Sequence, residues 1–314
     1  MQGDFFLTTW FFEGMKWIYE NVTAHNAVLT ILISTLFIKG ITIFSDIASR
    51  KSSMKMSAIQ PEISKIQKKY KDDPRRAQQE QQKLMKERGI SMWGGCLPML
   101  IMMPLFFCFI AAFRFWGYEQ MVKLLISMNE NPNNTEIFES FRFLWVHNIW
   151  QPDNGMVPVI MKAENFLAIK ELPKLLYFQQ NPEALQIFRN LGFIIEDVKN
   201  IPQASIDKYN ELVKPLLDLY PGKNNGWFIW PLLAGATMFL SSWIMQKGQP
   251  KNDAAGGTGK FMVYVFPIMS FVFCLNYNTS FAIYWTISSI VTLGINLLLN
   301  KKYPRSLPAE GVKK

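Results

Sequence analysis

A lysine inside an apolar run is the residue with the clearest chemical meaning. Lys39 lies within residues 27–45 (AVLTILISTLFIKGITIFS), six residues before the end of the run. A charge near the centre of a membrane helix is disfavoured by roughly 2.5–3.5 kcal/mol on insertion scales, and such a residue usually faces a wet cavity or a partner. Lys39 therefore indicates a polar site inside a membrane.

Two sets of polar side chains recur at three- and four-residue intervals, which places each set along one side of a helix. The first set is Thr35, Lys39, Thr42 and Asp46, and the second is Trp285, Ser289, Thr292 and Asn296. Because lipid offers these groups no hydrogen-bond partner, they are expected to face the helix bundle or water. One interpretation is a hydrated, positively charged cavity that opens inward. The alternative is that Ser, Thr and Asn join helices while Lys39 extends toward the cytoplasmic headgroups.

Five apolar runs approach the roughly 17–25 residues that a tilted helix needs to cross a bilayer. They are residues 27–45, 97–113, 227–245, 261–275 and 281–299. The first twenty residues carry seven aromatic side chains interrupted by Asp4 and Glu13, which favours a helix in the headgroup layer over a signal peptide. The sequence therefore predicts an all-α polytopic membrane protein with five transmembrane helices and an N-terminal interfacial amphipathic helix.

The distribution of charge predicts the orientation. Residues 50–92 carry twelve Lys/Arg against five Asp/Glu, whereas residues 117–226 carry ten against thirteen. Basic loops stay on the cytoplasmic side of a membrane. The N-terminus and residues 117–226 are therefore expected outside, and residues 50–92 and the C-terminus inside.

The predicted parts follow from these runs and charges. In chain order they are an interfacial amphipathic helix (1–21), TM1 (22–48), a cytoplasmic helical hairpin (49–92), TM2 (93–116), an extracytoplasmic loop with a helical insertion (117–226), TM3 (227–246), a cytoplasmic loop (247–260), TM4 (261–276), TM5 (278–299) and a basic cytoplasmic tail (300–314).

The two polar parts have their own patterns. The second arm of the hairpin holds few apolar residues (Ala77, Leu84, Met85), too few to bury in a core, and the pattern predicts a mobile, weakly anchored helical hairpin; a solvated charged connector is the alternative. In the insertion, residues 166–176, 182–191 and 205–219 have helical spacing, and a small helical cap on the outer surface is expected.

Other kinds of site are disfavoured. Cys96, Cys108 and Cys274 lie in or beside apolar runs, which argues against a disulfide framework and a zinc site. His25 and His147 lack metal-ligand spacing, which also argues against a membrane-embedded hydrolase. We expect no metal, no cofactor and no catalytic residue.

Three segments, in this order along the chain, match a known family. Residues 53–62 read SMKMSAIQPE, residues 89–106 read GISMWGGCLPMLIMMPLF, and residues 143–148 read FLWVHN. They resemble the hairpin opening, the GVNPLxGCxPxLIQMPIF-type signature and the segment before the third span of the YidC/Oxa membrane protein insertases. The resemblance covers about residues 15–153 and 227–302.

The resemblance implies a hydrophilic groove that is open to the cytoplasm and to lipid but closed to the outside. In that family a basic residue of the first span, generally arginine, lies in the groove; here the matching residue is Lys39, which lacks arginine's planar fork. Met102 stands where the family usually has glutamine. Together with the polar stripes, the implied substrate-binding groove comprises Lys39, Thr35, Thr42, Tyr284, Trp285, Ser289, Thr292 and Asn296.

The implied function is that of a membrane protein insertase or chaperone, not an enzyme, in a bacterial plasma (inner) membrane. Such a protein takes nascent hydrophobic segments into the bilayer, alone or with the Sec translocon. The implied partners are nascent membrane proteins, the Sec translocon, the lipid bilayer, and the ribosome and signal recognition components through the hairpin and basic tail. A small-solute or ion transporter is the alternative, although the sequence has no evident inverted repeat and one strongly buried charge.

Overall fold

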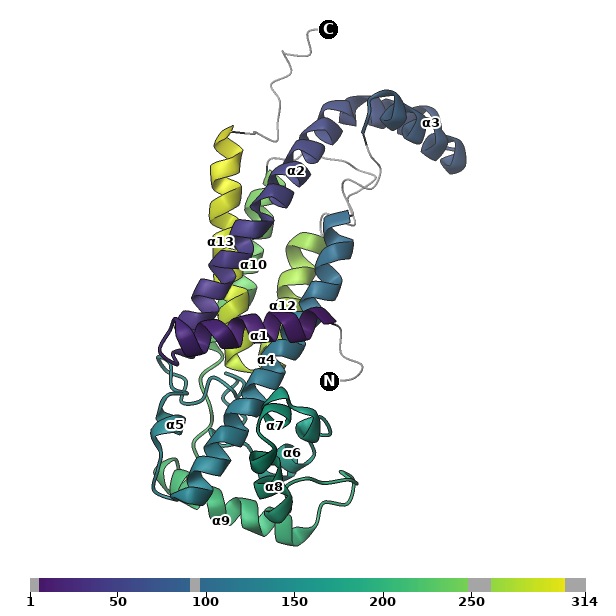
Figure 1. Cartoon of the computed structure of the whole chain (residues 1–314). Helices are drawn as coiled ribbons and strands as arrows, with labels where there is room; N and C mark the ends of the chain where they lie inside the picture. The colour runs from purple at the N-terminus through teal and green to yellow at the C-terminus, as the bar shows by residue number, and fades with distance from the viewer. Residues whose placement is uncertain (1–5, 91–96, 248–260, 303–314) are drawn as a thin grey trace. The chain divides into compact units, whose positions relative to one another are not determined.

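Helices are the regular elements of the described residues, and turns and irregular segments connect them. The computed structural model describes residues 6–90, 97–247 and 261–302 (Figure 1). In these ranges the extended pairing consists of two isolated bridges, Phe143 with Val146 and Pro158 with Asn224. The predicted all-α class is confirmed.

Two helices in the described ranges are long and apolar enough to cross a membrane, α2 (Ala27–Lys69) and α13 (Thr279–Lys302). α10 (Ile229–Lys247) and α12 (Phe266–Asn276) are shorter apolar helices. The remaining elements are α1 (Phe6–Asn21), α3 (Pro74–Glu87), α4 (Leu97–Glu130), α5 (Glu136–Glu139), α6 (Ala163–Leu167), η2 (Leu172–Lys174), α7 (Leu176–Gln180), α8 (Pro182–Asn190), α9 (Gln203–Leu219) and the π-helix η4 (Phe261–Val265). Crossing by five helices stays a prediction.

The chain forms two compact units. The first unit comprises Met1–Ser34, Phe107–Ala234 and Phe271–Trp285, and the second comprises Thr35–Phe106, Gly235–Ser270 and Thr286–Lys314. Each of the helices α2, α4, α10, α12 and α13 contributes residues to both units.

The hairpin of the second unit is built from the end of α2 and from α3. α2 runs without a break from the predicted first span into the first arm, with Pro61 inside it. The side chain of Asp73 caps α3 by accepting a hydrogen bond from the backbone N–H of Arg76 at 3.0 Å. The guanidinium of Arg88 donates to both carboxylate oxygens of Glu62, at 2.9 and 3.1 Å, and so joins the two arms.

The expectation that the second arm of the hairpin has too few apolar residues to join a core is wrong. Ile59, Ile63 and Ile90 are buried together, and Met56, Leu84 and Met85 pack against them. The second arm supplies few apolar side chains, but the first arm and the residue that follows Gly89 complete the cluster.

The insertion of the first unit has an aromatic core. Its almost fully buried rings are Phe166, Phe178, Phe188, Phe193 and Tyr209. Figure 1 shows α6 to α9 gathered around the C-terminal part of α4. The helix predicted at residues 166–176 is divided into α6, η2, which contains Pro173, and the start of α7.

A buried carboxylate holds the N-terminus of α10. Asp153 has no exposed surface. It accepts hydrogen bonds from the backbone N–H groups of Trp227, Phe228 and Trp230 and from the indole N–H of Trp145. Gly226 is required beside it, because its φ is +70° and a Cβ there would collide with the carboxylate. The negative charge also complements the positive end of the helix dipole.

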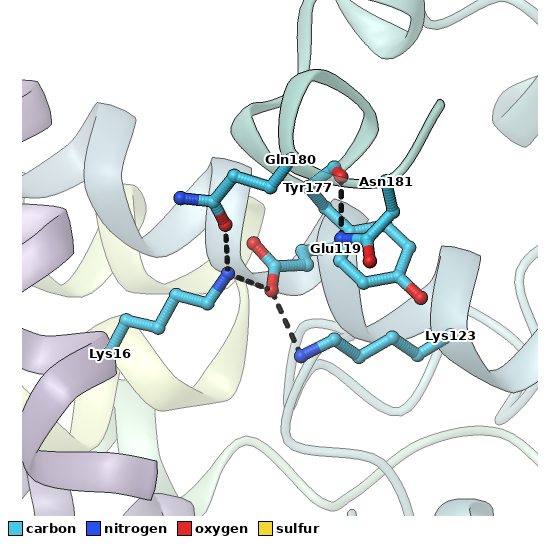
Figure 2. Close-up of polar contacts among 6 residues, drawn as sticks. All are labelled: Lys16, Glu119, Lys123, Tyr177, Gln180 and Asn181. Atoms are coloured by element: carbon cyan, nitrogen blue, oxygen red, sulfur yellow. Dashed lines mark hydrogen bonds and ion pairs between the residues drawn. The ribbon is translucent and has the colours of Figure 1, made fainter. Parts of the chain in front are cut away.

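A second buried carboxylate joins three parts of the first unit (Figure 2). Oε1 of Glu119, on α4, lies 3.1 Å from Nζ of Lys16 on α1 and 2.9 Å from Nζ of Lys123. Lys16 also donates to Oε1 of Gln180 in the insertion at 3.1 Å. Both ammonium groups lie over the ring of Tyr177, at 5.9 and 5.3 Å from its centroid.

The surroundings make the Tyr177 hydroxyl harder to ionise than an ordinary tyrosine hydroxyl. Burial and, next, the Glu119 carboxylate raise the pKa of Tyr177, and Lys16 offsets part of this rise. The ring therefore offers a neutral π-face to two cations. Glu119 and Tyr177 together connect α1, α4 and α7.

Replacing Asp153 by asparagine is expected to destabilise the first unit, because one oxygen cannot accept four hydrogen bonds and the new NH₂ group would face other donors. Bonds to charged groups contribute about 1.5–3 kcal/mol each, so the loss should be on the order of 2–3 kcal/mol. Thermal unfolding in detergent measures it, with the exposed Asp218→Asn as the matched control. Equal melting temperatures for the two variants would contradict the role of Asp153.

Glu119→Gln is expected to lower the melting temperature more than Lys16→Met. The first change leaves two partly buried ammonium groups facing each other without an anion, whereas the second leaves Glu119 paired with Lys123. Breaking a buried ion pair in this way costs about 3–5 kcal/mol. The same unfolding assay ranks the two variants, and the reverse order would show that Lys123 does not hold Glu119 by itself.

Candidate functional site

The first polar stripe lies on α2 in the second unit. Thr35 is buried, and Lys39, Thr42 and Asp46 are half-buried. The hydroxyl of Thr42 donates to the backbone carbonyl of Lys39 at 3.4 Å. The Lys39 ammonium and the Asp46 carboxylate are close enough to attract each other electrostatically. The stripe is therefore a row of polar groups around a cation and an anion.

Arg50 extends this stripe and was missed by the sequence analysis. It is buried, with 3% of its surface exposed. Arg50 follows Asp46 by four residues and Lys39 by eleven, so it lies on the same side of α2. The helical register places Arg50 on this side of the helix, whereas the end of the apolar run at Ser45 places it in the predicted polar hairpin. The row is thus cation, anion, cation.

The second stripe lies on α13, also in the second unit. Ser289 is buried, and its Oγ lies 3.9 Å from Sδ of Met238 on α10. The Thr292 hydroxyl donates to the carbonyl of Ser288 at 2.7 Å, and the Asn296 amide donates to the carbonyl of Thr292 at 2.9 Å. Thr292 and Asn296 therefore donate hydrogen bonds to backbone carbonyls of their own helix, while their side-chain oxygens can still accept hydrogen bonds.

The aromatic pair belongs to the first unit. Tyr284 is buried, with its ring centroid 5.1 Å from that of Phe109 and 5.3 Å from that of Phe113. Trp285 is half-buried and contacts Phe281 at 5.7 Å. These contacts give Tyr284 a packing role; contact with a substrate stays a prediction for both residues.

The second unit buries polar side chains and exposes apolar ones. The buried polar residues of its apolar helices are Thr35, Arg50, Gln60, Ser241, Ser270, Thr286 and Ser289. The exposed apolar residues on the same helices include Phe37, Ile41, Phe44, Ile268 and Leu298, with Phe44 exposing 77% of its surface. A soluble core has the reverse arrangement. This distribution is typical of helices surrounded by lipid.

Part of the predicted site and its neighbours lies outside the described residues. Residues 91–96 of the signature, the 248–260 loop and the tail from 303 onward are among these, and so is the side chain of Met102. In the ranges that are described, no group of three or more His, Cys, Asp and Glu side chains could hold a metal ion.

Comparison with known proteins identifies the family. A family model described as "60Kd inner membrane protein" matches residues 17–306. The chain is 36% identical over 142 residues to the membrane protein insertase YidC of Clostridium perfringens (strain 13 / Type A), covering 45% of this chain and 52% of that protein.

Two further relatives carry the same name. The chain is 38% identical over 140 residues to the protein of Clostridium tetani (strain Massachusetts / E88), covering 44% of this chain and 55% of that protein. It is 25% identical over 282 residues to the protein of Chlorobium phaeovibrioides (strain DSM 265 / 1930), covering 90% and 34%. The chain thus spans about half or less of the length of these curated relatives. Because the family model covers most of its residues, the chain belongs to the YidC/Oxa family of 60Kd inner membrane proteins.

Proposed function

We propose that the chain is a membrane protein insertase that takes nascent hydrophobic segments into the lipid bilayer. The observation that carries this proposal is the reversed packing of the second unit, with polar side chains buried and large apolar side chains exposed. Such a unit suits contact with lipid on its outside and with a polar client on its inside. The names of the relatives support the same function.

The proposed topology has five spans in a bacterial plasma membrane, with the N-terminus outside and the C-terminus in the cytoplasm. The excess of Lys/Arg in residues 50–92 supports a cytoplasmic hairpin. The excess of Asp/Glu in residues 117–226 is compatible with an exported insertion. α2, α4, α10, α12 and α13 supply the spans.

The proposed groove is formed by Lys39, Thr35, Thr42, Tyr284, Trp285, Ser289, Thr292 and Asn296. Its polar walls bring water partway into the bilayer, which shortens the hydrophobic barrier for the polar end of a client. Lys39 attracts acidic residues of that end; at about 4 Å and an effective dielectric near 20, one such attraction is about 4 kcal/mol before desolvation. The apolar segment of the client then leaves sideways into lipid, and its burial drives the reaction.

The proposed partners follow from the same parts of the chain. Nascent membrane proteins are the clients, and the Sec translocon is a partner for some of them. The basic hairpin and tail are suited to contact the ribosome and signal recognition components, because clustered Lys and Arg attract RNA and anionic lipid.

Lys39→Ala is expected to reduce insertion several-fold for a single-span client with an acidic exported tail, while Lys39→Arg retains insertion. The physical reason is loss of an attraction in the groove that depends on the sign of the client's charge. Reconstituted vesicles and protease protection of the tail give the measurement.

Two controls separate this effect from a general defect. Lys55→Ala removes an exposed lysine on the same helix and should insert the acidic client normally. A client with a neutral tail should be inserted equally well by the unaltered chain and by the Lys39→Ala variant. Normal insertion of the acidic client by Lys39→Ala would remove the electrostatic part of the proposal.

Replacing the hairpin, residues 60–90, by a short Gly/Ser linker is expected to reduce delivery of ribosome-bound clients without unfolding the first unit. The hairpin has its own small apolar core, so its removal takes away most of that core and leaves only Ile59 and Met56 at the end of α2. Co-translational insertion and thermal unfolding are measured on the same protein. If the product is unfolded, the hairpin is structural and its delivery role is contradicted.

A further inference from the structure

A pocket of about 540 Å³ lies in the first unit beside the start of α10. Its lining includes His147, Lys223, Trp227, Phe228 and the backbone of Gly155. The volume falls within the range of small-molecule sites, about 300–1,000 Å³. None of these residues belongs to the proposed groove.

One side of the pocket is cationic. The Lys223 ammonium lies 5.9 Å from the centroid of the Tyr220 ring, and the His147 ring lies 5.1 Å from the same ring. Nδ1 of His147 is buried and has no hydrogen-bond partner among the described residues. Burial and then the charges of Arg142 and Lys223 lower the pKa of His147. This side therefore combines positive charge with a polar atom that a ligand could satisfy.

The other side is aromatic and opens next to an apolar helix. Trp227 exposes 71% of its surface and Phe228 exposes 41%. Both directly precede Ile229, where α10 begins. Tryptophan at the end of a membrane helix is characteristic of the headgroup layer. The pocket thus presents aromatic and cationic groups beside the start of an apolar helix.

The backbone of the pocket is strained and held in place. Phe228 has a φ of +66°, which is unusual for a bulky residue, and its ring lies against Gly155, where a Cβ would come within 2.8 Å of it. The Asp153 carboxylate beneath fixes Trp227 and Phe228 through their N–H groups. Because that carboxylate already accepts four hydrogen bonds, its charge is compensated. Strain held by the surrounding structure is often found at ligand sites.

We propose that this pocket binds the headgroup of an anionic phospholipid. Lys223 pairs with the phosphate, His147 hydrogen-bonds to it, and Trp227 and Phe228 contact the glycerol and the first acyl carbons. The proposal requires α10 to cross the bilayer; it does not require insertion of clients, so its failure would be distinct from failure of the proposed function. In the proposed topology, the lipid belongs to the outer leaflet.

The two histidines of the chain provide the test. The full chain, labelled with ¹⁵N-histidine, is placed in nanodiscs of pure phosphatidylcholine or of phosphatidylcholine with phosphatidylglycerol. A bound anionic headgroup stabilises the imidazolium, so the titration midpoint of His147 is expected to rise by about one pH unit. This is a tenfold decrease in the acid dissociation constant of the imidazolium. His25, exposed just before α2, senses the general surface potential of the bilayer and should move less.

Matched variants and a free-anion arm complete the experiment. Lys223→Gln should abolish the excess shift of His147 between the two lipid mixtures, whereas Lys208→Gln, an exposed lysine paired with Glu211, should retain it. Equal shifts of the two histidines would overturn the proposal. So would an excess shift that survives Lys223→Gln, or one that inorganic phosphate reproduces in phosphatidylcholine nanodiscs, since the latter would identify a site for a free anion.

Discussion

The constraint on which the structure depends is that lipid cannot accept or donate hydrogen bonds. In the second unit, polar groups such as Thr35 and Ser289 are buried, while Phe37 and Phe44 are exposed. Thr292 and Asn296 also donate to their own helix, so the cost of placing them in an apolar environment is reduced. A row of charges along α2 is tolerated for the same reason: Lys39 and Asp46 are close enough to compensate each other in part.

The first unit is stabilised differently. Its insertion buries aromatic rings against one another, and two buried carboxylates, Asp153 and Glu119, each hold several polar partners. Each carboxylate joins segments that are distant in the sequence: Asp153 fixes the residues before α10, and Glu119 connects α1 to α4. Such contacts cost much to break because the remaining partners are buried. The first unit is thus held by buried charge and ring contacts, whereas the second buries uncharged polar side chains beside its exposed apolar ones.

The sequence was sufficient for the helical class, the family and the polar stripe of α2, because these depend on local periodicity and short motifs. It was insufficient wherever a helix continues past a change in composition: Arg50 was assigned to the hairpin because the apolar run ends before it. The hairpin core was missed because Ile59 and Ile90 come from different parts of the chain. Asp153 could not be recognised as a cap, since its backbone partners lie 74 to 77 residues away. The positions of the two stripes relative to each other remain a prediction.

The unbroken course of α2 has a mechanical consequence. From Lys39 to Lys69 the helix spans about 45 Å at 1.5 Å per residue, and both ends of this stretch belong to the second unit. No loop separates them within α2; Pro61, which has no backbone N–H to donate, lies within the hairpin arm. Between Lys39 and Pro61 the chain is continuous helix. A tilt of the first hairpin arm would therefore be transmitted along the same helix to Lys39.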